Sequence, residues 1–353
     1  MPTGKTILSE AAIPDTTGIL NASQSTLAGW GNRACAPTLT LRGPGLNFRH
    51  TMVILVTGGS GLIGRRLIPY LETRGHRVVR LVRSRDKVCE KAVFWSTSEG
   101  RVYWDESGRI DALVHLAGES ILGRWTRAKK ARIRDSRVDP TRSLCAFLAG
   151  METPPRVLVA ASATGFYGNR GEEPLVEESL SGNGFLPGVC RQWEAATGPA
   201  RDAGIRVANL RIGMVLTPEG GALAAMRTPF RLALGGKIGD GRQYMSWITR
   251  DDLVAAIRFI LESDELEGPV NAVAPGPVDN AEFTRVLGLA LHRPTPFSVP
   301  AFAVRLLFGQ MGNDLLLASA KVIPEHLQQA GFQFEHADLE SALNDLLQAR
   351  PST

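Results

Sequence analysis

Two side chains with acid–base chemistry, Cys190 and Glu194, lie four residues apart in the stretch GVCRQWEAA. Residues at this spacing share one face of a helix, so we expect the thiol and the carboxylate side by side. A thiol with its reference pKa of about 8.5 can donate a proton, but a neighbouring carboxylate raises that pKa. Glu194 could accept hydrogen bonds or act as a base. The alternative is that Cys190 fills space in the core and that Glu194 is only a polar neighbour.

A glycine-rich loop in the stretch VTGGSGLIG joins the first predicted strand to a predicted helix. In a βαβ unit such glycines permit a tight turn, let the main chain approach a pyrophosphate and let the helix pack closely. Free N–H groups at the start of the helix then bind the phosphates. The alternative is a loop that serves only a tight turn. The dinucleotide site predicted from this loop comprises Thr57, Gly58, Gly59, Ser60, Gly61, Leu62, Ile63 and Gly64.

The end of the second predicted strand indicates which dinucleotide is bound. Arg83, Ser84 and Arg85 follow this strand, and the first carboxylate after the strand is Asp86. An NAD site needs an acidic residue for the ribose 2′-hydroxyl, whereas a guanidinium suits a 2′-phosphate. The sequence therefore favours NADP(H) over NAD. The alternative is that one or both arginines are solvated surface charges.

Two further polar groups lie where ligands of open α/β folds bind. Arg211 ends the predicted strand IRVANLRIG and could hold a phosphate or form an ion pair. The stretch GDGRQYMSW combines aromatic and guanidinium groups that suit a ring or a phosphate. It could line a substrate pocket or pack within a lobe. Its candidate residues are Arg242, Gln243, Tyr244 and Trp247.

The elements that must position these residues alternate between strand and helix. The predicted strands are MVILVT, HRVVRLVR, ALVHLAG, RVLVAAS and IRVANLRIG, and helices are expected over residues 61–75, 126–148 and around 191–201. Nearly continuous apolar strands between helices indicate a parallel sheet covered on both faces. We therefore predict an α/β fold, a Rossmann-type doubly wound parallel sheet with a smaller, mainly helical C-terminal lobe.

The expected organisation has three parts. Residues 1–51 are rich in Thr, Ser, Gly and Pro and form a disordered extension or a mis-assigned start, with a transit peptide as a further alternative. Residues 52–297 form the dinucleotide-binding domain with insertions for the substrate. Residues 298–347 form a C-terminal helical domain.

Composition excludes several classes of function. The net charge of +5 over 353 residues includes no basic block, so nucleic acid is not an expected partner. No apolar run approaches the roughly 18 residues of a membrane span, so no membrane partner is expected. The four cysteines are scattered, which indicates reduced thiols and a cytoplasmic protein. The six histidines lack metal-ligand spacing, so no metal site is predicted.

The stretches TGGSGLIG, HLAG and SATGFYG resemble the extended short-chain dehydrogenase/reductase superfamily, which includes nucleotide-sugar epimerases and dehydratases. LAGESILGRW, CRQWEAA, RIGMVL, PFRLALGGKIGDGRQYMSWI, DNAEF and the tail KVIP…GFQF are similar to its atypical 39U subgroup of epimerase family proteins. The resemblance covers residues 52 to about 347 and implies a Rossmann-type domain, a nicotinamide dinucleotide and a C-terminal helical segment. It also implies a segment beneath the adenine side and ribose, made of Leu116, Ala117, Gly118 and Glu119.

Ordinary members of this superfamily carry a catalytic tyrosine, with a lysine four residues later that binds ribose and lowers the tyrosine pKa. The resemblance places Cys190 and Glu194 at these positions, and none of the four tyrosines has lysine at +4. Ser162 and Thr164 fall near the superfamily's catalytic serine or threonine, although SATGFYG is one residue longer than the usual pattern. Tyr167 is the phenol nearest the expected nicotinamide side; the alternative is a packed aromatic.

Two functions are consistent with these residues. The first is an NADP(H)-dependent oxidoreductase or epimerase acting on an unknown small molecule, with proton transfer through Glu194, Tyr167 or a water. The second is a non-catalytic dinucleotide-binding sensor or interaction protein, linked to cell or organelle division. A monomer or a homodimer is expected in either case.

Overall fold

A twisted eight-stranded sheet forms the centre of the protein in the computed structural model, which describes residues 51–104 and 109–348. All neighbouring strands run parallel except the edge pair β3 and β4. Across the sheet the order is β13 (Gly268–Ala272), β8 (Arg206–Ile212), β6 (Val157–Ala163), β5 (Ala112–His115), β1 (Val53–Thr57), β2 (Arg77–Val82), β3 (Ala92–Ser96) and β4 (Arg101–Val102). The Rossmann-type doubly wound sheet predicted from the sequence is confirmed.

The chain reverses its direction of travel across the sheet between β1 and β5. From β1 it moves outward through β2 to β3, and β5 then returns to the other side of β1. Ligands of doubly wound folds bind at the carboxyl ends of the strands at this switch point. The glycine loop follows β1 and the HLAG segment follows β5, so both meet there.

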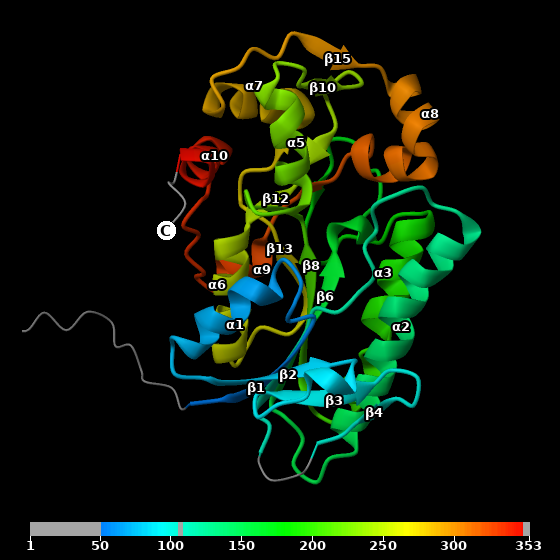
Figure 1. The fold of residues 1–353 in the computed structure, drawn as a ribbon, viewed down its shortest axis with the longest axis vertical. Helices are drawn as coiled ribbons and strands as arrows, with labels where there is room; N and C mark the ends of the chain where they lie inside the picture. Colours follow the sequence, from blue (N-terminus) through cyan, green and yellow to red (C-terminus); the bar gives the residue numbers. More distant parts are fainter. Residues whose placement is uncertain (1–50, 105–108, 349–353) are drawn as a thin grey trace, which may run out of the picture. The chain divides into compact units, whose positions relative to one another are not determined.

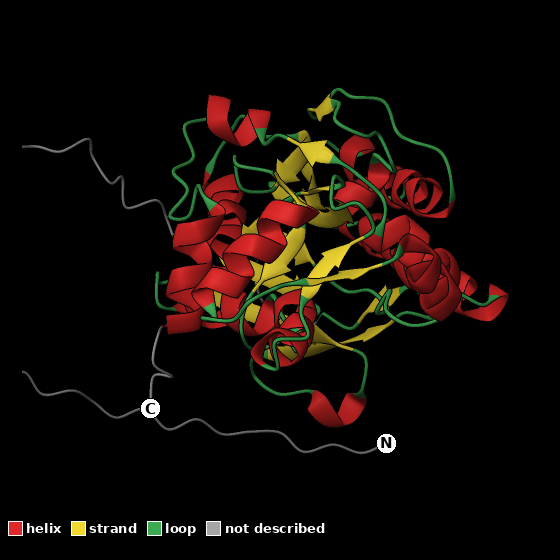
Figure 2. Cartoon of the chain, turned by 90° about the horizontal axis from the view of Figure 1, so that it is seen from above, coloured by secondary structure: helices red, strands yellow, loops and turns green. Residues whose placement is uncertain are grey.

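Helices cover both faces of the sheet, as Figure 1 shows with the sheet between its left and right helices. On one face, α1 (Gly64–Glu72) and α6 (Arg250–Glu262) bury Leu67, Leu71 and Leu253. On the other face lie α2 (Arg127–Ala149), α3 (Phe185–Ala195) and α4 (Gly198–Asp202). Figure 2, viewed from above, shows the strands enclosed in the same way. Burial on both faces explains why the strands are almost uniformly apolar.

The helix that carries Cys190 and Glu194 begins earlier than the sequence indicates. α3 starts at Phe185, directly after Gly184 with φ of 114°, and it ends at Ala195. A separate short helix, α4, follows it. The prediction of one helix around residues 191–201 was therefore wrong at both ends, although Cys190 and Glu194 do share α3.

Most of the remaining elements build a lobe above the carboxyl edge of the sheet (Figure 1). Its helices are α5 (Gly221–Arg231), α7 (Asn280–Ala290), α8 (Ala301–Met311) and α10 (Leu339–Gln348), whereas α9 (Glu325–Gln329) packs against β13. Its short paired strands are β9 (Met214–Leu216) with β12 (Trp247–Thr249), β10 (Gly236–Ile238) with β15 (Phe297–Val299), β11 (Tyr244–Met245) with β14 (Val278–Asp279), and β7 (Pro174–Leu175) with β16 (Lys321–Val322).

Residues after 297 contribute to cores that are built by earlier residues. β16 pairs with β7, and Leu327 and Phe332 belong to the same apolar cluster as the strands β1 and β6. The boundary at residues 297 and 298 stays a prediction, as does the state of residues 1–51, which, apart from Thr51, lie outside the described part. None of the helices among the described residues has the length and apolarity needed to cross a membrane.

Candidate dinucleotide site

The glycine loop leaves room for a ligand by excluding side chains. Gly58 has φ of 69°, and a Cβ there would lie 2.8 Å from the main-chain carbon of Leu116. A Cβ on Gly64 would overlap the carbonyl oxygen of Gly58, so the helix α1 can start directly against the loop only without one. The N–H of Gly61 donates to the Gly58 carbonyl at 2.9 Å and closes the turn. This is the geometry that lets main-chain amides approach a pyrophosphate.

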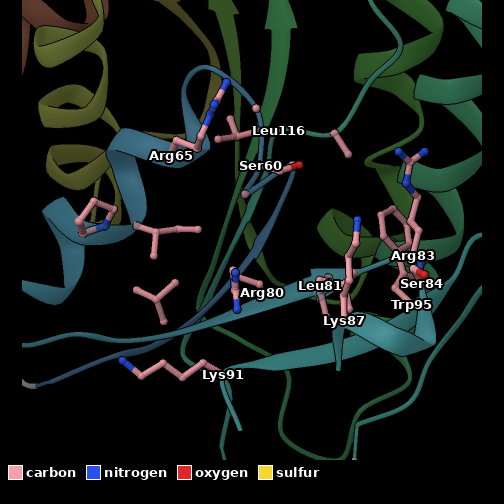
Figure 3. Close-up of a pocket in the computed structure, with 18 of the residues that line it drawn as sticks. Ser60, Arg65, Arg80, Leu81, Arg83, Ser84, Lys87, Lys91, Trp95 and Leu116 are labelled. Atoms are coloured by element: carbon pink, nitrogen blue, oxygen red, sulfur yellow. The ribbon is translucent and has the colours of Figure 1, made fainter. Parts of the chain in front are cut away.

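A cavity of about 1220 Å³ opens beside this loop, between the ends of β1, β2 and β5 (Figure 3). Of the predicted residues, Gly58, Gly59, Ser60, Gly61, Arg83, Ser84, Leu116, Ala117 and Gly118 line it. It also contains four cations that the sequence reasoning missed: Arg65, Arg80, Lys87 and Lys91. Glu72 is the only carboxylate residue of this lining, and it pairs with Lys91 at 3.0 Å. The cavity therefore carries a clear excess of positive charge for phosphates.

Arg83 and Arg85 have different environments. Arg83 and Ser84 line the cavity, whereas the Arg85 guanidinium stacks over the rings of Phe94 at 4.3 Å and Tyr103 at 4.9 Å. The Ser84 hydroxyl donates to Asp86, the first carboxylate after the strand. Cation–π stacking therefore places Arg85 outside the cavity lining, and a role for Arg85 in cofactor binding stays a prediction.

Other predicted cofactor residues support the loop without lining the cavity. Ile63 packs on the apolar core, and Leu62 lies close to Gly220. Glu119 binds Lys129 at 2.8 Å, and its carbonyl accepts a hydrogen bond from Arg137. The side chains of these three residues are thus engaged elsewhere, and direct binding of the cofactor by these residues stays a prediction.

Thr57 belongs to a buried hydrogen-bond network with His115. Its hydroxyl oxygen accepts from the main-chain N–H groups of Leu116 at 3.1 Å and Ala117 at 3.2 Å, and lies 2.7 Å from Nδ1 of His115. Because the oxygen already accepts twice, its proton goes to Nδ1, and His115 carries its own proton on Nε2. That nitrogen lies 2.9 Å from the Thr141 hydroxyl, which also accepts from Trp193 at 3.1 Å. The network thus links the glycine loop to α3.

Lowering the pH is expected to weaken folding through His115. Burial lowers the pKa of this imidazole from 6.5 to about 4, so the unfolded chain binds a proton more readily than the folded protein. The contribution of neutral His115 to the free energy of unfolding is roughly 3 kcal/mol. It is complete above a pH of about 6.5 and is lost as the pH falls toward 4. Urea unfolding measured at several pH values across this range would show a free energy of unfolding that falls with decreasing pH. The slope of this dependence should be smaller in His115→Asn. Equal slopes in both proteins would contradict this role.

The second cluster joins the carboxyl ends of β6 and β8 to α3. Ser162 is the penultimate residue of β6 and donates to Oε1 of Glu194 at 2.6 Å. Arg211, near the end of β8, donates to Oε1 at 2.9 Å and to Oε2 at 3.0 Å. The Arg211 and Glu194 side chains are 4% and 13% exposed. Charge-assisted bonds of this bidentate kind fix both groups. Of the two alternatives for Arg211, the structure shows the ion pair.

Tyr167 and Cys190 are poorly suited to donate protons. The Tyr167 side chain is fully buried, and its hydroxyl accepts from Arg211 at 2.9 Å and lies 2.7 Å from Oδ1 of Asn271. Burial raises the pKa of Tyr167 to about 12. Burial, followed by the charge of Glu194, raises the pKa of Cys190 to about 12 as well. These properties favour the alternatives for both residues, a packed aromatic and a core filler, and their catalytic role stays a prediction.

The GDGRQYMSW stretch is held mainly by packing. Gln243 is buried and donates to the carbonyls of Ile238 and Leu316. Trp247 is fully buried and donates to the Gly276 carbonyl at 3.0 Å. For these two residues the structure supports the packing alternative over a substrate pocket.

Glu177, Glu178 and His326 come together although the sequence shows no metal-ligand spacing. Their candidate ligand atoms lie within 4.8 Å of one another. His326 already has a partner on each ring nitrogen, Glu178 at 2.7 Å and the Pro269 carbonyl at 3.0 Å. The ion pair of His326 and Glu178 ties α9 to the loop after β7, whereas Oε2 of the buried Glu177 has no hydrogen-bond partner among the described residues.

Together these features define a class, the Rossmann-type proteins that bind a nicotinamide dinucleotide. The residues present fit that ligand, because the loop excludes side chains where phosphates approach and the adjoining cavity is cationic. The chain belongs to the NAD dependent epimerase/dehydratase family, whose model matches residues 54–273. Residues 299–346 match a domain of unknown function, DUF1731.

Relatives cover nearly the whole described chain. An epimerase family protein of Mycobacterium leprae is 42% identical over 293 residues, which are 83% of this chain and 94% of the relative. A chloroplastic SDR39U1 homologue of Arabidopsis thaliana is 37% identical over 84% of this chain and 87% of its own. The crystal structure of human epimerase family protein SDR39U1 with NADPH is 33% identical, with a TM-score of 0.77, over 85% of this chain and 100% of that one. The predicted atypical extended short-chain dehydrogenase/reductase family is thereby confirmed.

Proposed function

We propose that this protein binds NADP(H) in preference to NAD(H). The observation that carries the proposal is the position of Arg83, Ser84 and Lys87 in one cavity with the glycine loop. Cations at the end of the second strand suit the 2′-phosphate that distinguishes NADP from NAD. The crystal structure of the human relative SDR39U1 was determined with NADPH, which supports the proposed preference for NADP(H).

Replacing Arg83 with alanine is expected to weaken NADPH binding by about 10- to 100-fold, the equivalent of one lost charge-assisted hydrogen bond. NADH has no 2′-phosphate, so its affinity should change little. Calorimetric titration of both nucleotides measures this difference. The matched control is Arg85→Ala, because Arg85 stacks on Phe94 and Tyr103 outside the cavity lining. If both variants lose the same affinity for NADPH, or if the wild type binds NADH more tightly than NADPH, the assignment of Arg83 is wrong.

The reaction proposed is a redox or epimerase step on a small molecule, with Ser162 and Glu194 handling the proton. Bound NADP(H) would supply hydride transfer. In oxidation of a substrate alcohol, the Ser162 hydroxyl could accept the proton of the alcohol as its own proton passes to Glu194, since their oxygens lie 2.6 Å apart. Reduction of a carbonyl would reverse both proton transfers. Arg211 orients the Glu194 carboxylate by its two hydrogen bonds. In this arrangement Arg211 is the cation beside the proton-transfer group, a place that lysine takes in ordinary members.

The second candidate, a dinucleotide-binding sensor without turnover, is favoured by one observation. The Glu194 carboxylate already accepts hydrogen bonds from Arg211 and Ser162. The pKa of each of the two other candidate proton donors, Tyr167 and Cys190, is raised to about 12. Absorbance of bound NADPH, followed on addition of sugars, aldehydes or quinones, separates the two candidates. Turnover that disappears in Glu194→Gln while NADPH still binds supports the enzyme. Absence of turnover with intact NADPH binding supports the sensor. A cytoplasmic location and a monomer or homodimer stay predictions in both cases.

A further inference from the structure

The exposed large apolar side chains of the described residues are concentrated on one part of the lobe. Nine of the thirteen lie directly after α5, at the end of α7, on β15 and on α8. We call them the lobe patch: Leu232, Leu234, Leu289, Phe297, Val299, Phe302, Leu306, Leu307 and Phe308. Exposed apolar patches of this kind mark interaction surfaces, because water does not favour them on a monomer.

The segments that carry the patch adjoin one another. β10 pairs with β15 in parallel register, with Gly236 opposite Phe297, and α8 begins two residues after β15. The Arg293 side chain also donates to the Arg231 carbonyl at 3.0 Å, which connects the end of α7 to the end of α5. Figure 1 places α5, α7, β10, β15 and α8 at the same end of the molecule, away from β1 to β4.

The helix α8 is the most exposed part of the patch. Phe302 is 71% exposed and Leu306, one turn later, is 79% exposed, and Leu307 beside it is 68% exposed. Only Val304 and Met311 of this helix are buried. A helix that is apolar on nearly all sides is normally covered, so α8 has an unfilled contact surface.

The charge around the patch is mainly positive. Residues 231–239 and 289–308 contain Arg231, Lys237, Arg293 and Arg305, all exposed, and no aspartate or glutamate. One exposed carboxylate, Asp240, directly follows the first of these segments, and the next after the second segment is Asp314. A second copy docked through this surface would oppose cation to cation, whereas an anionic lipid surface supplies both opposite charge and an apolar layer.

We infer that the lobe patch docks the protein onto the surface of a membrane that contains anionic lipids. The apolar side chains of α8 and β15 enter the boundary between headgroups and acyl chains, and the four cations pair with the headgroups. The sequence-based expectation of no membrane partner concerns membrane-spanning segments, and surface docking needs none. The inference is independent of the proposed nucleotide chemistry.

The test is sedimentation of the purified full-length protein with phosphatidylcholine vesicles, with and without about 30% phosphatidylglycerol. We expect binding to the anionic vesicles and a weaker association at about 1 M salt, where charges are screened. Leu306→Gln should lower the binding constant by about tenfold or more, because the apolar contribution is lost. Arg305→Gln should lower it by roughly fivefold, the equivalent of one cation near the surface.

Leu180→Gln is the matched control, since Leu180 is 80% exposed but lies in the loop after β7. It should bind vesicles as the wild type does, and the urea midpoint of all three variants should stay unchanged. Failure to bind the anionic vesicles, equal binding to pure phosphatidylcholine, or equal loss in Leu180→Gln would overturn the inference. The inference would also be overturned if the wild type were a dimer that does not bind vesicles and Leu306→Gln converted it to a monomer. The lobe patch would then contact a second copy of the chain.

Discussion

Replacing Arg211 with alanine is expected to lower the free energy of unfolding by about 3–5 kcal/mol, the usual cost of removing one partner from a buried ion pair. The guanidinium donates to both oxygens of Glu194, to the Tyr167 hydroxyl and to the Glu177 carbonyl. It also lies 3.5 Å from the centre of the Phe166 ring. Its removal leaves a largely buried carboxylate without a counter-charge, and urea unfolding measures the effect.

The matched control for this prediction is Arg285→Ala. Arg285 forms a pair of similar length with Glu282, at 2.7 Å, but the two side chains are 54% and 43% exposed. Exposed pairs contribute about 0–1 kcal/mol, so this variant should unfold almost as the wild type does. Similar losses in the two variants would show that burial does not determine the strength of the Arg211 pair. The combined Arg211→Met and Glu194→Leu substitution should recover much of the lost stability, because no unpaired charge remains.

The second large effect is expected from Gly58→Ala, which should weaken binding of NADPH by roughly 100-fold or more, the equivalent of about 3 kcal/mol. The added Cβ meets the main chain of Leu116 at 2.8 Å, and φ of 69° is strained for alanine. Relief of this contact moves the loop away from the position where its amides approach phosphates. Calorimetric titration with NADPH measures the loss.

Gly198→Ala provides the control for Gly58→Ala. Gly198 starts α4, and a Cβ there meets nothing within 4 Å. The control variant should bind NADPH with unchanged affinity. A folded Gly58→Ala protein that binds NADPH as tightly as the wild type would show that the loop does not contact the nucleotide.

The sequence predicts the fold and the loop well because both depend on local patterns. Apolar strands that alternate with helices specify a parallel sheet, and Gly58 and Gly64 stand where only glycine fits. The position of Arg83 and Ser84 at the cavity could be expected because the end of the second strand has a fixed relation to the loop. Lys87 was missed, although it is only two residues beyond Arg85 and lines the same cavity.

The second cluster could not be predicted in the same way because it depends on tertiary packing. The contact between Glu194 and Arg211 joins a helix to a strand, and no spacing rule relates them. Burial, which decides the pKa of Tyr167 and Cys190, also arises only in the folded chain. The earlier start of α3 had a visible signal, since Pro187 is tolerated in the first turn of a helix and Gly184 precedes it.

The pairing of β16 with β7 has a consequence for biosynthesis. Contacts in this region join residues as far apart as Glu178 and His326, 148 positions along the chain, and the late residues Leu327 and Phe332 complete the core that the first strands begin. Long-range closure of this kind slows folding, and a ribosome releases the chain from its N-terminus. The nascent protein must therefore keep the part of its sheet beside β13 uncovered until residues 321–332 have been synthesised, which makes chaperone protection most important during that interval.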